Sequence, residues 1–225
     1  MKKKIILGVL SILAITSSVS ALAYSDCKNE TVDELTELKI LDGYDDGTFN
    51  PDGLISRAEI SKIIATITGY TEGVVEIESF PDVDESHWAF EYVKYCKTSD
   101  GIDGYDDGTF RPNENVTYAE AVKICLSAVG YNHLIVLPDD VVWYEPWLDM
   151  AVEYKVIDNK DKDPNAKATR LEVAEMVVRT IDLTQCVTTG YDGSVPQFGL
   201  AEAFVGRDGK EYPRTTLRSR YFQEK

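Results

Sequence analysis

The amino-acid sequence predicts a mostly helical protein built from repeated units, and three observations support this prediction. The stretch LDGYDDGTFNPDGLISRAE at residues 41–59 returns as IDGYDDGTFRPNENVTYAE at residues 102–120, which sets a period of 61 residues. Each copy ends in the pattern S/T-x-x-E, which is typical of a helix start. Apolar residues then recur at helical spacing. An internal period of this length indicates units that bury their apolar faces against one another.

The helix starts share one capping arrangement, and a worn third copy, ATRLE at residues 168–172, carries it as well. In this arrangement the first hydroxyl accepts a hydrogen bond from the third helical amide, and the carboxylate reaches back to the amide of the capping residue. We therefore expect a structural role for all six capping side chains. They are Ser56, Glu59, Thr117, Glu120, Thr169 and Glu172.

The N-terminus predicts an export signal. Three lysines precede an apolar run, and Ala21-Leu22-Ala23 suits a cleavage site, so we expect residues 1–23 to be a signal peptide. No other stretch approaches the ~20 apolar residues that a bilayer crossing requires. We expect the units at residues 24–70, 71–131 and 132–186, the first truncated at its N-terminus and the third degenerate. Residues 187–225 form a tail, either with a short hairpin around Gly206–Gly209 or flexible.

Charge and composition narrow the classes of function. The net charge is −16, and it becomes −19 without the three signal lysines, so we expect no nucleic-acid partner. The chain has two histidines, neither in a zinc or nucleophile motif, and no catalytic domain remains outside the repeats. A calcium loop starting at Asp103 is disfavoured because Tyr105 stands at its third position. We therefore expect no enzyme, metal or cofactor.

Four cysteines in an exported protein permit disulfides without requiring them. Cys96 and Cys125 fall at the repeat positions of Leu35 and Ile64, which are predicted core residues. A Cys96–Cys125 disulfide is our first expectation. Buried reduced thiols that act as small apolar residues are the alternative.

These motifs resemble the S-layer homology family of bacterial cell-surface modules. The resemblance rests on GYDDGTFNPDGLISRAE, on FPDVDESHWAFEYVKYCKTSDGIDGYDDGTFRPNENVTYAE and on ATRLE, and it covers residues 31–183. It implies three tandem units that form a pseudo-threefold helical body, in which helix-loop-helix prongs surround a central three-helix bundle. It also implies non-covalent attachment to secondary cell-wall polysaccharide, an anionic and often pyruvylated polymer, in grooves between neighbouring units.

The family's Thr-Arg-Ala-Glu motif maps onto the three helix starts and leaves its arginine available. Arg57 and Arg170 hold the first helical position, where backbone amides and the helix dipole favour an anion. A guanidinium there can bind a carboxylate at two points. Pairing with a surface carboxylate is the alternative. If the arginines are available, replacing both with alanine should weaken wall binding with little change in melting temperature.

Other candidate binding residues follow from the same resemblance. Tyr118 stands where the other copies have arginine, so its groove should bind anions poorly or stack on a sugar ring. Trp147 is taken as the counterpart of Trp88, and both could stack on sugars or lie in the core. The first unit lacks the Phe-Pro-Asp-Val segment and its tryptophan, so we expect one groove to be incomplete. The remaining candidates are loop residues Gly43, Asp45, Gly104 and Asp106.

Two functions remain open at this point. The first is a secreted, non-catalytic module that anchors itself to wall polysaccharide on a bacterial surface, with another surface protein docked on its C-terminal tail. The second is a structural surface-layer protein that assembles through protein contacts and has lost polymer binding.

Overall fold

The computed structural model describes residues 24–73, 77–98, 102–202, 204–205, 211–212 and 214–222. The predicted signal peptide and the predicted turn at Gly206–Gly209 lie outside these residues. The described chain contains mainly helices and two small antiparallel sheets, which confirms the mostly α prediction. None of its helices is both long and apolar enough to cross a membrane.

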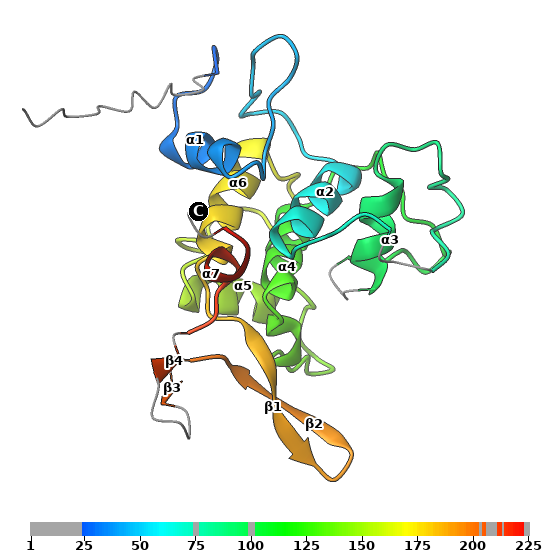
Figure 1. Cartoon of the computed structure of the whole chain (residues 1–225). Helices are drawn as coiled ribbons and strands as arrows, with labels where there is room; N and C mark the ends of the chain where they lie inside the picture. The colour runs from blue at the N-terminus through cyan, green and yellow to red at the C-terminus, as the bar shows by residue number, and fades with distance from the viewer. Residues whose placement is uncertain are drawn as a thin grey trace, which may run out of the picture.

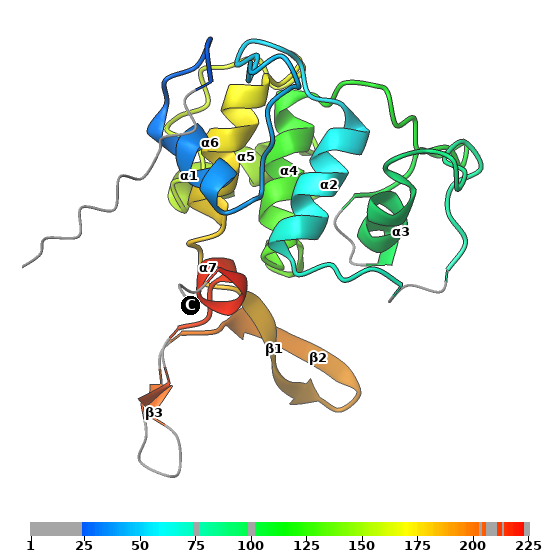
Figure 2. The ribbon, with the colours of Figure 1, turned by 45° about the horizontal axis from the view of Figure 1, so that its top comes forward.

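Three helices of equal length lie side by side at the centre of the molecule (Figure 2). They are α2 (Arg57–Ile67), α4 (Tyr118–Ala128) and α6 (Arg170–Thr180). A shorter helix precedes each of them: α1 (Glu30–Glu37), α3 (Phe90–Thr98) and α5 (Glu145–Glu153). We call α1 with α2, α3 with α4, and α5 with α6 the first, second and third repeats.

The peripheral helices pack in a cyclic order. Helix α3 packs on α2 of the first repeat and α5 packs on α4 of the second, whereas α1 returns to α6 of the third (Figure 1). Each repeat therefore buries its first helix against a neighbouring repeat, and the first repeat closes the ring on the last.

The same cyclic order appears in the backbone just before the central helices. Isolated antiparallel bridges join Ser56 to Asn115, Thr117 to Lys167, and Thr169 to Leu54. Each central helix begins with a complete capping box, which confirms the structural role expected for the six capping side chains. These contacts give the bundle a pseudo-threefold arrangement.

The core lies between the central helices and under the loops. Phe49 and Phe110 are fully buried and hold the two GYDDGTF loops against the bundle. Gly47 and Gly108 adopt φ near +80° at the loop tips, a conformation that favours glycine.

The expected disulfide between Cys96 and Cys125 is wrong, and both residues are reduced, buried thiols. The Cys96 thiol in α3 donates to the carbonyl of Ser61 across a 3.5 Å contact, whereas Cys125 lies inside α4 beside Thr180. Both cysteines lie in the core, as their repeat positions predicted. However, Cys96 faces α2 and Cys125 faces α6, so the two thiols do not meet. The alternative of buried thiols is confirmed.

We predict that neither thiol reacts with iodoacetamide in the native protein at pH 8. Burial raises the pKa of Cys96 and of Cys125 to about 12, so the reactive thiolate is scarce. Mass spectrometry without reductant should find both cysteines modified only after unfolding in urea. Failure to label them in urea would instead indicate a disulfide.

The C-terminal region leaves the bundle and returns to it. A hairpin of β1 (Cys186–Asp192) and β2 (Val195–Leu200) projects from the body, and a second pair, β3 (Phe204–Val205) and β4 (Glu211–Tyr212), follows (Figure 1). The last helix of the described residues is α7 (Leu217–Tyr221), which lies against α2. The hairpin of β1 and β2 turns at residues 193–194 and was not predicted, and neither was α7, whereas the turn expected at Gly206–Gly209 lies outside the described residues.

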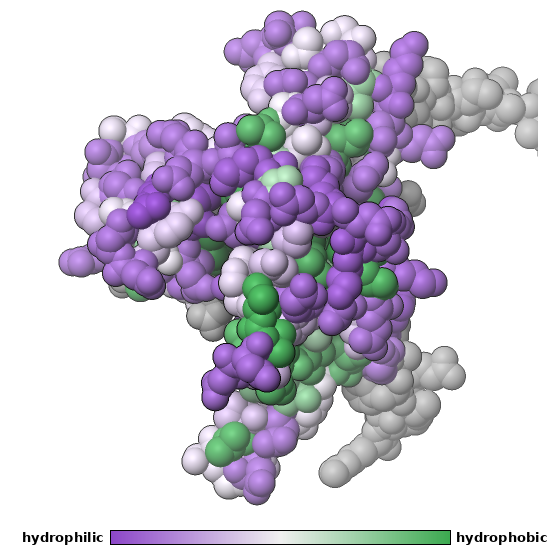
Figure 3. Space-filling model, turned by 180° about the vertical axis from the view of Figure 1, so that it is seen from behind, coloured by the Kyte–Doolittle hydropathy of each residue, from purple (hydrophilic) through white to green (hydrophobic). Residues whose placement is uncertain are grey.

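Exposed apolar side chains gather on one segment between η1 (Tyr131–His133) and α5. The view from behind shows a mostly hydrophilic surface with a few strongly hydrophobic residues above the projecting hairpin (Figure 3). The large exposed apolar residues of the segment are Val136, Leu137, Val141, Val142 and Trp143. This segment forms an apolar rim beside one of the grooves described below.

Candidate functional site

Three hollows lie at equivalent contacts between repeats. We name each after the residue at the first position of a central helix. The Arg57 groove, of about 230 Å³, is lined by Arg57, Asp103, Tyr105, Glu120, Lys123 and Trp143. The Arg170 groove, of about 210 Å³, is lined by Asp42, Tyr44, Glu59, Lys62, Trp88 and Arg170. The Tyr118 groove, of about 50 Å³, is lined by Tyr118, Asp158, Glu172, Glu175, Met176 and Arg179.

Arg57 lies across the contact between the first two repeats and is only 5% exposed. Its Nε donates to the carbonyl of Phe110 at 2.7 Å, and its Nη2 donates to the carbonyl of Asp103 at 2.6 Å. Among the described residues, its Nη1 has no hydrogen-bond partner and the guanidinium has no carboxylate within 4 Å. One edge of the guanidinium thus holds the loop, while the other remains available to the groove.

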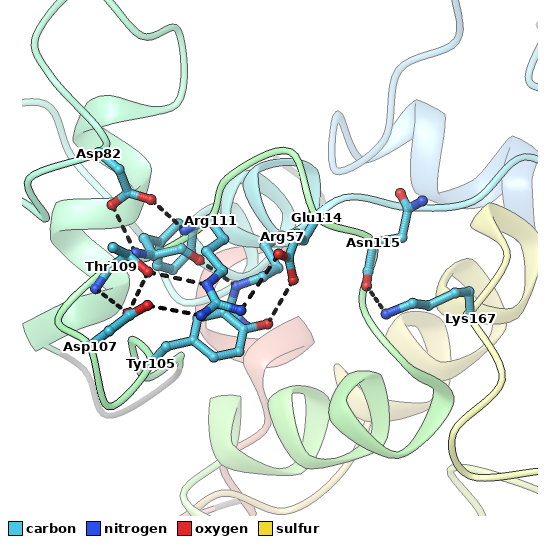
Figure 4. A network of polar contacts seen from close by, with 10 residues as sticks. Arg57, Asp82, Tyr105, Asp107, Thr109, Arg111, Glu114, Asn115 and Lys167 are labelled. Carbon is cyan, nitrogen blue, oxygen red and sulfur yellow. Dashed lines mark hydrogen bonds and ion pairs between the residues drawn. The ribbon is translucent and has the colours of Figure 1, made fainter.

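Tyr105 forms a wall of this groove and contacts two arginines (Figure 4). The guanidinium carbon of Arg57 lies 4.8 Å from its ring centre, and that of Arg111 lies 3.9 Å away. Arg111 also pairs with Asp107 at 2.9 Å, and hydrogen bonds from Thr109 and Arg111 hold the pKa of that carboxyl far below its usual range. This exposed network fixes the loop that carries Tyr105.

Arg170 makes the equivalent contacts between the third repeat and the first. It is 8% exposed, and it donates from Nε to the Phe49 carbonyl at 2.9 Å and from Nη2 to the Asp42 carbonyl at 3.1 Å. Unlike Arg57, it also pairs through Nη1 with Glu59 Oε1 at 3.2 Å. The expectation of an available arginine is therefore wrong for Arg170, for which the alternative of pairing with a carboxylate holds.

The amides at the helix starts are not available to an anion, contrary to the sequence-based expectation. The first amide of each central helix donates to a carbonyl of a neighbouring repeat, at 2.8–2.9 Å. The acceptors are Glu114 for Arg57, Ala166 for Tyr118 and Gly53 for Arg170. The third amide of each helix is bound by its capping hydroxyl. Anion binding at the grooves would thus depend on side chains.

A lysine and an aspartate pair in both arginine grooves. Lys62 lies 2.8 Å from Asp42, and Lys123 lies 2.9 Å from Asp103, with all four side chains partly exposed. Exposed pairs of this kind are weak and exchange readily with other ions. The sequence-based interpretation missed these four residues, although their shared 61-residue spacing could have revealed them.

The tryptophans are placed differently from the prediction. Trp88 is 56% exposed and lines the Arg170 groove, but Trp147 is 4% exposed, lies in the core and lines none of the three grooves. Trp143, 43% exposed, lines the Arg57 groove instead. Matching the buried pair Val93/Cys96 to Leu148/Ala151, 55 residues later, would have aligned Trp143 with Trp88.

The loop glycines and aspartates also separate. Gly43 and Gly104 line the two arginine grooves, and a Cβ at either position would collide with the ring of Tyr24 or Phe80. Asp45 and Asp106 are exposed and line none of the three grooves, so their assignment to the grooves is wrong. The preceding aspartates, at positions 42 and 103, line the grooves instead.

The first repeat contains a counterpart of the Phe-Pro-Asp-Val segment, which the sequence-based interpretation considered absent. Asp26 accepts hydrogen bonds from the amides of Phe49 and Asn50, both at 2.7 Å. Asp82 accepts the equivalent bonds in the second repeat. The amide of Phe49 in particular holds the pKa of Asp26 below its usual value. The sequence Tyr-Ser-Asp-Cys at residues 24–27 performs the same role, although no tryptophan follows it in the first repeat.

The Tyr118 groove has a different chemistry. Tyr118 is half-buried, and Glu175 occupies the position of Lys62 and Lys123. Its one lining cation, Arg179, pairs with Asp158 at 3.0 Å, and Lys162 beside the groove pairs with Glu172. This groove is smaller and more acidic than the others, and poor anion binding there stays a prediction.

No cluster of three or more metal-binding side chains occurs in the part of the chain that the structure describes. The loop that begins at Asp103 is closed by its own tyrosine, threonine and arginine contacts. The site is therefore built from guanidinium, ammonium, carboxylate and aromatic groups.

Comparison with known proteins gives two kinds of match. Residues 25–60 and 79–122 match a family model described as the S-layer homology domain. The chain is 28% identical over 207 residues to a middle cell wall protein of Brevibacillus brevis, covering 84% of this chain and 19% of the relative. It is 32% identical over 142 residues to a surface layer protein of Brevibacillus choshinensis, covering 57% and 13%.

A third relative is a cellulosome-anchoring protein of Acetivibrio thermocellus. The chain is 35% identical to it over 117 residues, covering 47% of this chain and 25% of that protein. The chain thus spans a quarter or less of the length of each of these three relatives.

Proposed function

The chain belongs to the S-layer homology family, and we propose that it is a non-catalytic anchor that binds an anionic cell-wall polysaccharide non-covalently. Its place of action is the wall or surface layer of a bacterium, as the names of its relatives suggest. The polymer's carboxylate, for example of a pyruvyl ketal, is the group that the grooves recognise. The tail is a candidate surface for a further partner protein.

One observation carries this proposal: one edge of the Arg57 guanidinium lies inside an open groove and has no partner in the part of the chain that the structure describes. Lys123 adds a second, exchangeable cation, and Trp143 offers a partly exposed ring to the apolar face of a sugar. A charge-assisted hydrogen bond in a partly desolvated groove is stronger than one at an open surface. The groove therefore combines the charge and the stacking face that an acidic sugar requires.

Co-sedimentation with purified cell walls tests the proposal. Residues 24–225 should bind intact walls and should lose binding after the polymer attached to the peptidoglycan is removed chemically. A matched pair of soluble disaccharides, with and without a pyruvyl ketal, should compete unequally if the carboxylate is recognised. Retention on the stripped walls would contradict polymer recognition.

A second candidate function is assembly into a surface lattice. The projecting hairpin favours it, because within the described residues each of its two strands pairs only with the other strand, which leaves an outer edge unpaired. Analytical ultracentrifugation without walls distinguishes the two functions. An anchor should remain monomeric as its concentration rises, whereas a lattice protein should form larger species.

A further inference from the structure

We infer that the two arginine grooves are unequal receptors, because Glu59 occupies Arg170 as an internal carboxylate while Arg57 stays open. The Arg57 groove is then the primary site, and Glu59 sets the affinity of the Arg170 groove. This inference rests on the proposed function, since it assigns different strengths to two grooves of the same anchor.

The hydrogen bonds of the two guanidinium groups differ at one nitrogen. In both arginines, Nε and Nη2 donate to loop carbonyls of a neighbouring repeat. The remaining Nη1 of Arg170 pairs with Glu59 at 3.2 Å, with side chains that are 9% and 30% exposed. The Nη1 of Arg57 has no partner among the described residues.

The two capping glutamates explain how this difference arises without a change of fold. Oε2 of Glu59 accepts from the amide of Ser56 at 2.8 Å, and its other oxygen, Oε1, meets Arg170. Oε2 of Glu120 accepts from the amide of Thr117 at 2.7 Å, but no ion pair joins Glu120 to Arg57. The capping geometry is therefore the same in both grooves. In the Arg170 groove the guanidinium pairs with the capping glutamate, whereas in the Arg57 groove it does not.

A carboxylate ligand must displace Glu59 before it can form a two-point contact with the Arg170 guanidinium. The internal pair is held in position by the cap, so the ligand competes with a preorganised group. When a ligand must replace one hydrogen bond to a charged group, its affinity commonly falls about tenfold. We therefore expect the Arg170 groove to bind about tenfold more weakly than the Arg57 groove.

Substitution of Glu59 by glutamine removes the competing charge while keeping the cap. Glutamine is an accepted residue at this position of a capping box, because its carbonyl oxygen can still receive the capping amide. Glu59→Gln should therefore free Arg170 without loss of the helix start. Glu153→Gln, at an exposed position of α5 that lines none of the three grooves, is the control for the loss of one negative charge.

The experiment first removes binding at the Arg57 groove with the substitution Lys123→Glu. This change places a glutamate at the partly exposed position that Glu175 occupies in the Tyr118 groove. Titration calorimetry of residues 24–225 with the polymer released from purified walls then measures the remaining site. In this background Glu59→Gln should raise the affinity about tenfold, and Glu153→Gln should leave it unchanged. Melting curves of all variants check that each is folded.

Three outcomes separate the inference from the proposed function. In the wild-type background, Lys123→Glu should weaken binding far more than Lys62→Glu, which supports unequal grooves. Equal losses from both lysine variants, with no gain from Glu59→Gln, would overturn the inference but leave the anchor intact. Binding that neither lysine variant changes would overturn the proposed function itself.

Discussion

Replacement of Arg57 by alanine should abolish most wall binding and also lower the melting temperature. The side chain is 5% exposed and donates to two carbonyls of the neighbouring repeat. Hydrogen bonds from a charged donor are worth about 1.5–3 kcal/mol each, and their loss leaves buried acceptors unpaired. We expect a loss of about 3 kcal/mol, or about 6–12 °C in a protein of this size. Calorimetric melting and wall co-sedimentation measure the two effects.

Two further variants make this result interpretable. Arg220→Ala removes an exposed arginine and should change neither property. Arg57→Lys keeps one charged donor, so it should recover part of the stability but not the two-point contact with a carboxylate. An unchanged melting temperature in Arg57→Ala would contradict the structural role and would restore the sequence-based expectation of little change in melting temperature.

The second large effect is expected at the C-terminal helix. Leu217 in α7 is 1% exposed and belongs to the main core, so Leu217→Ala should destabilise the protein by about 2–4 kcal/mol. The melting temperature should fall by about 4–16 °C, as measured by circular dichroism. A helix of five residues has no stability of its own in water, so it must be held by its contacts with the bundle.

The contacts around α7 explain why a terminal segment should matter so much. The Arg218 amide donates to the Ile181 carbonyl at 2.8 Å, and its side chain pairs with Asp182 and with Glu34 of α1. Tyr221 covers Gly69 at the end of α2. The apolar control is Val195→Ala in the hairpin, where the side chain is 59% exposed. Equal melting temperatures for both variants would show that α7 is not part of the folded core.

Local patterns predicted the helices and their starts, because a capping box and an apolar stripe need only residues within one or two turns. Ser56 and Thr117 illustrate this success. The burial of Arg57 and Arg170 was not predictable in this way. Their acceptors are main-chain carbonyls 46–128 residues away in sequence, and a carbonyl leaves no trace in the residue type.

The candidate site was predicted only where its residues belong to a pattern that repeats in the sequence. Gly43 and Gly104 were found because their loops repeat in sequence, and both line grooves. Trp143 was missed because the third repeat has a different spacing, which moved the alignment onto Trp147. The docking of α7 was missed because a short helix carries too few residues to show a periodic pattern.

The return of α1 to α6 has a consequence for how this architecture can change in evolution. An open array of repeats can gain or lose a copy at either end, because each copy contacts only its neighbours. Here the first and last copies are neighbours too. A fourth copy would have to break that contact, so duplication should yield a second, separate three-copy body rather than a longer one.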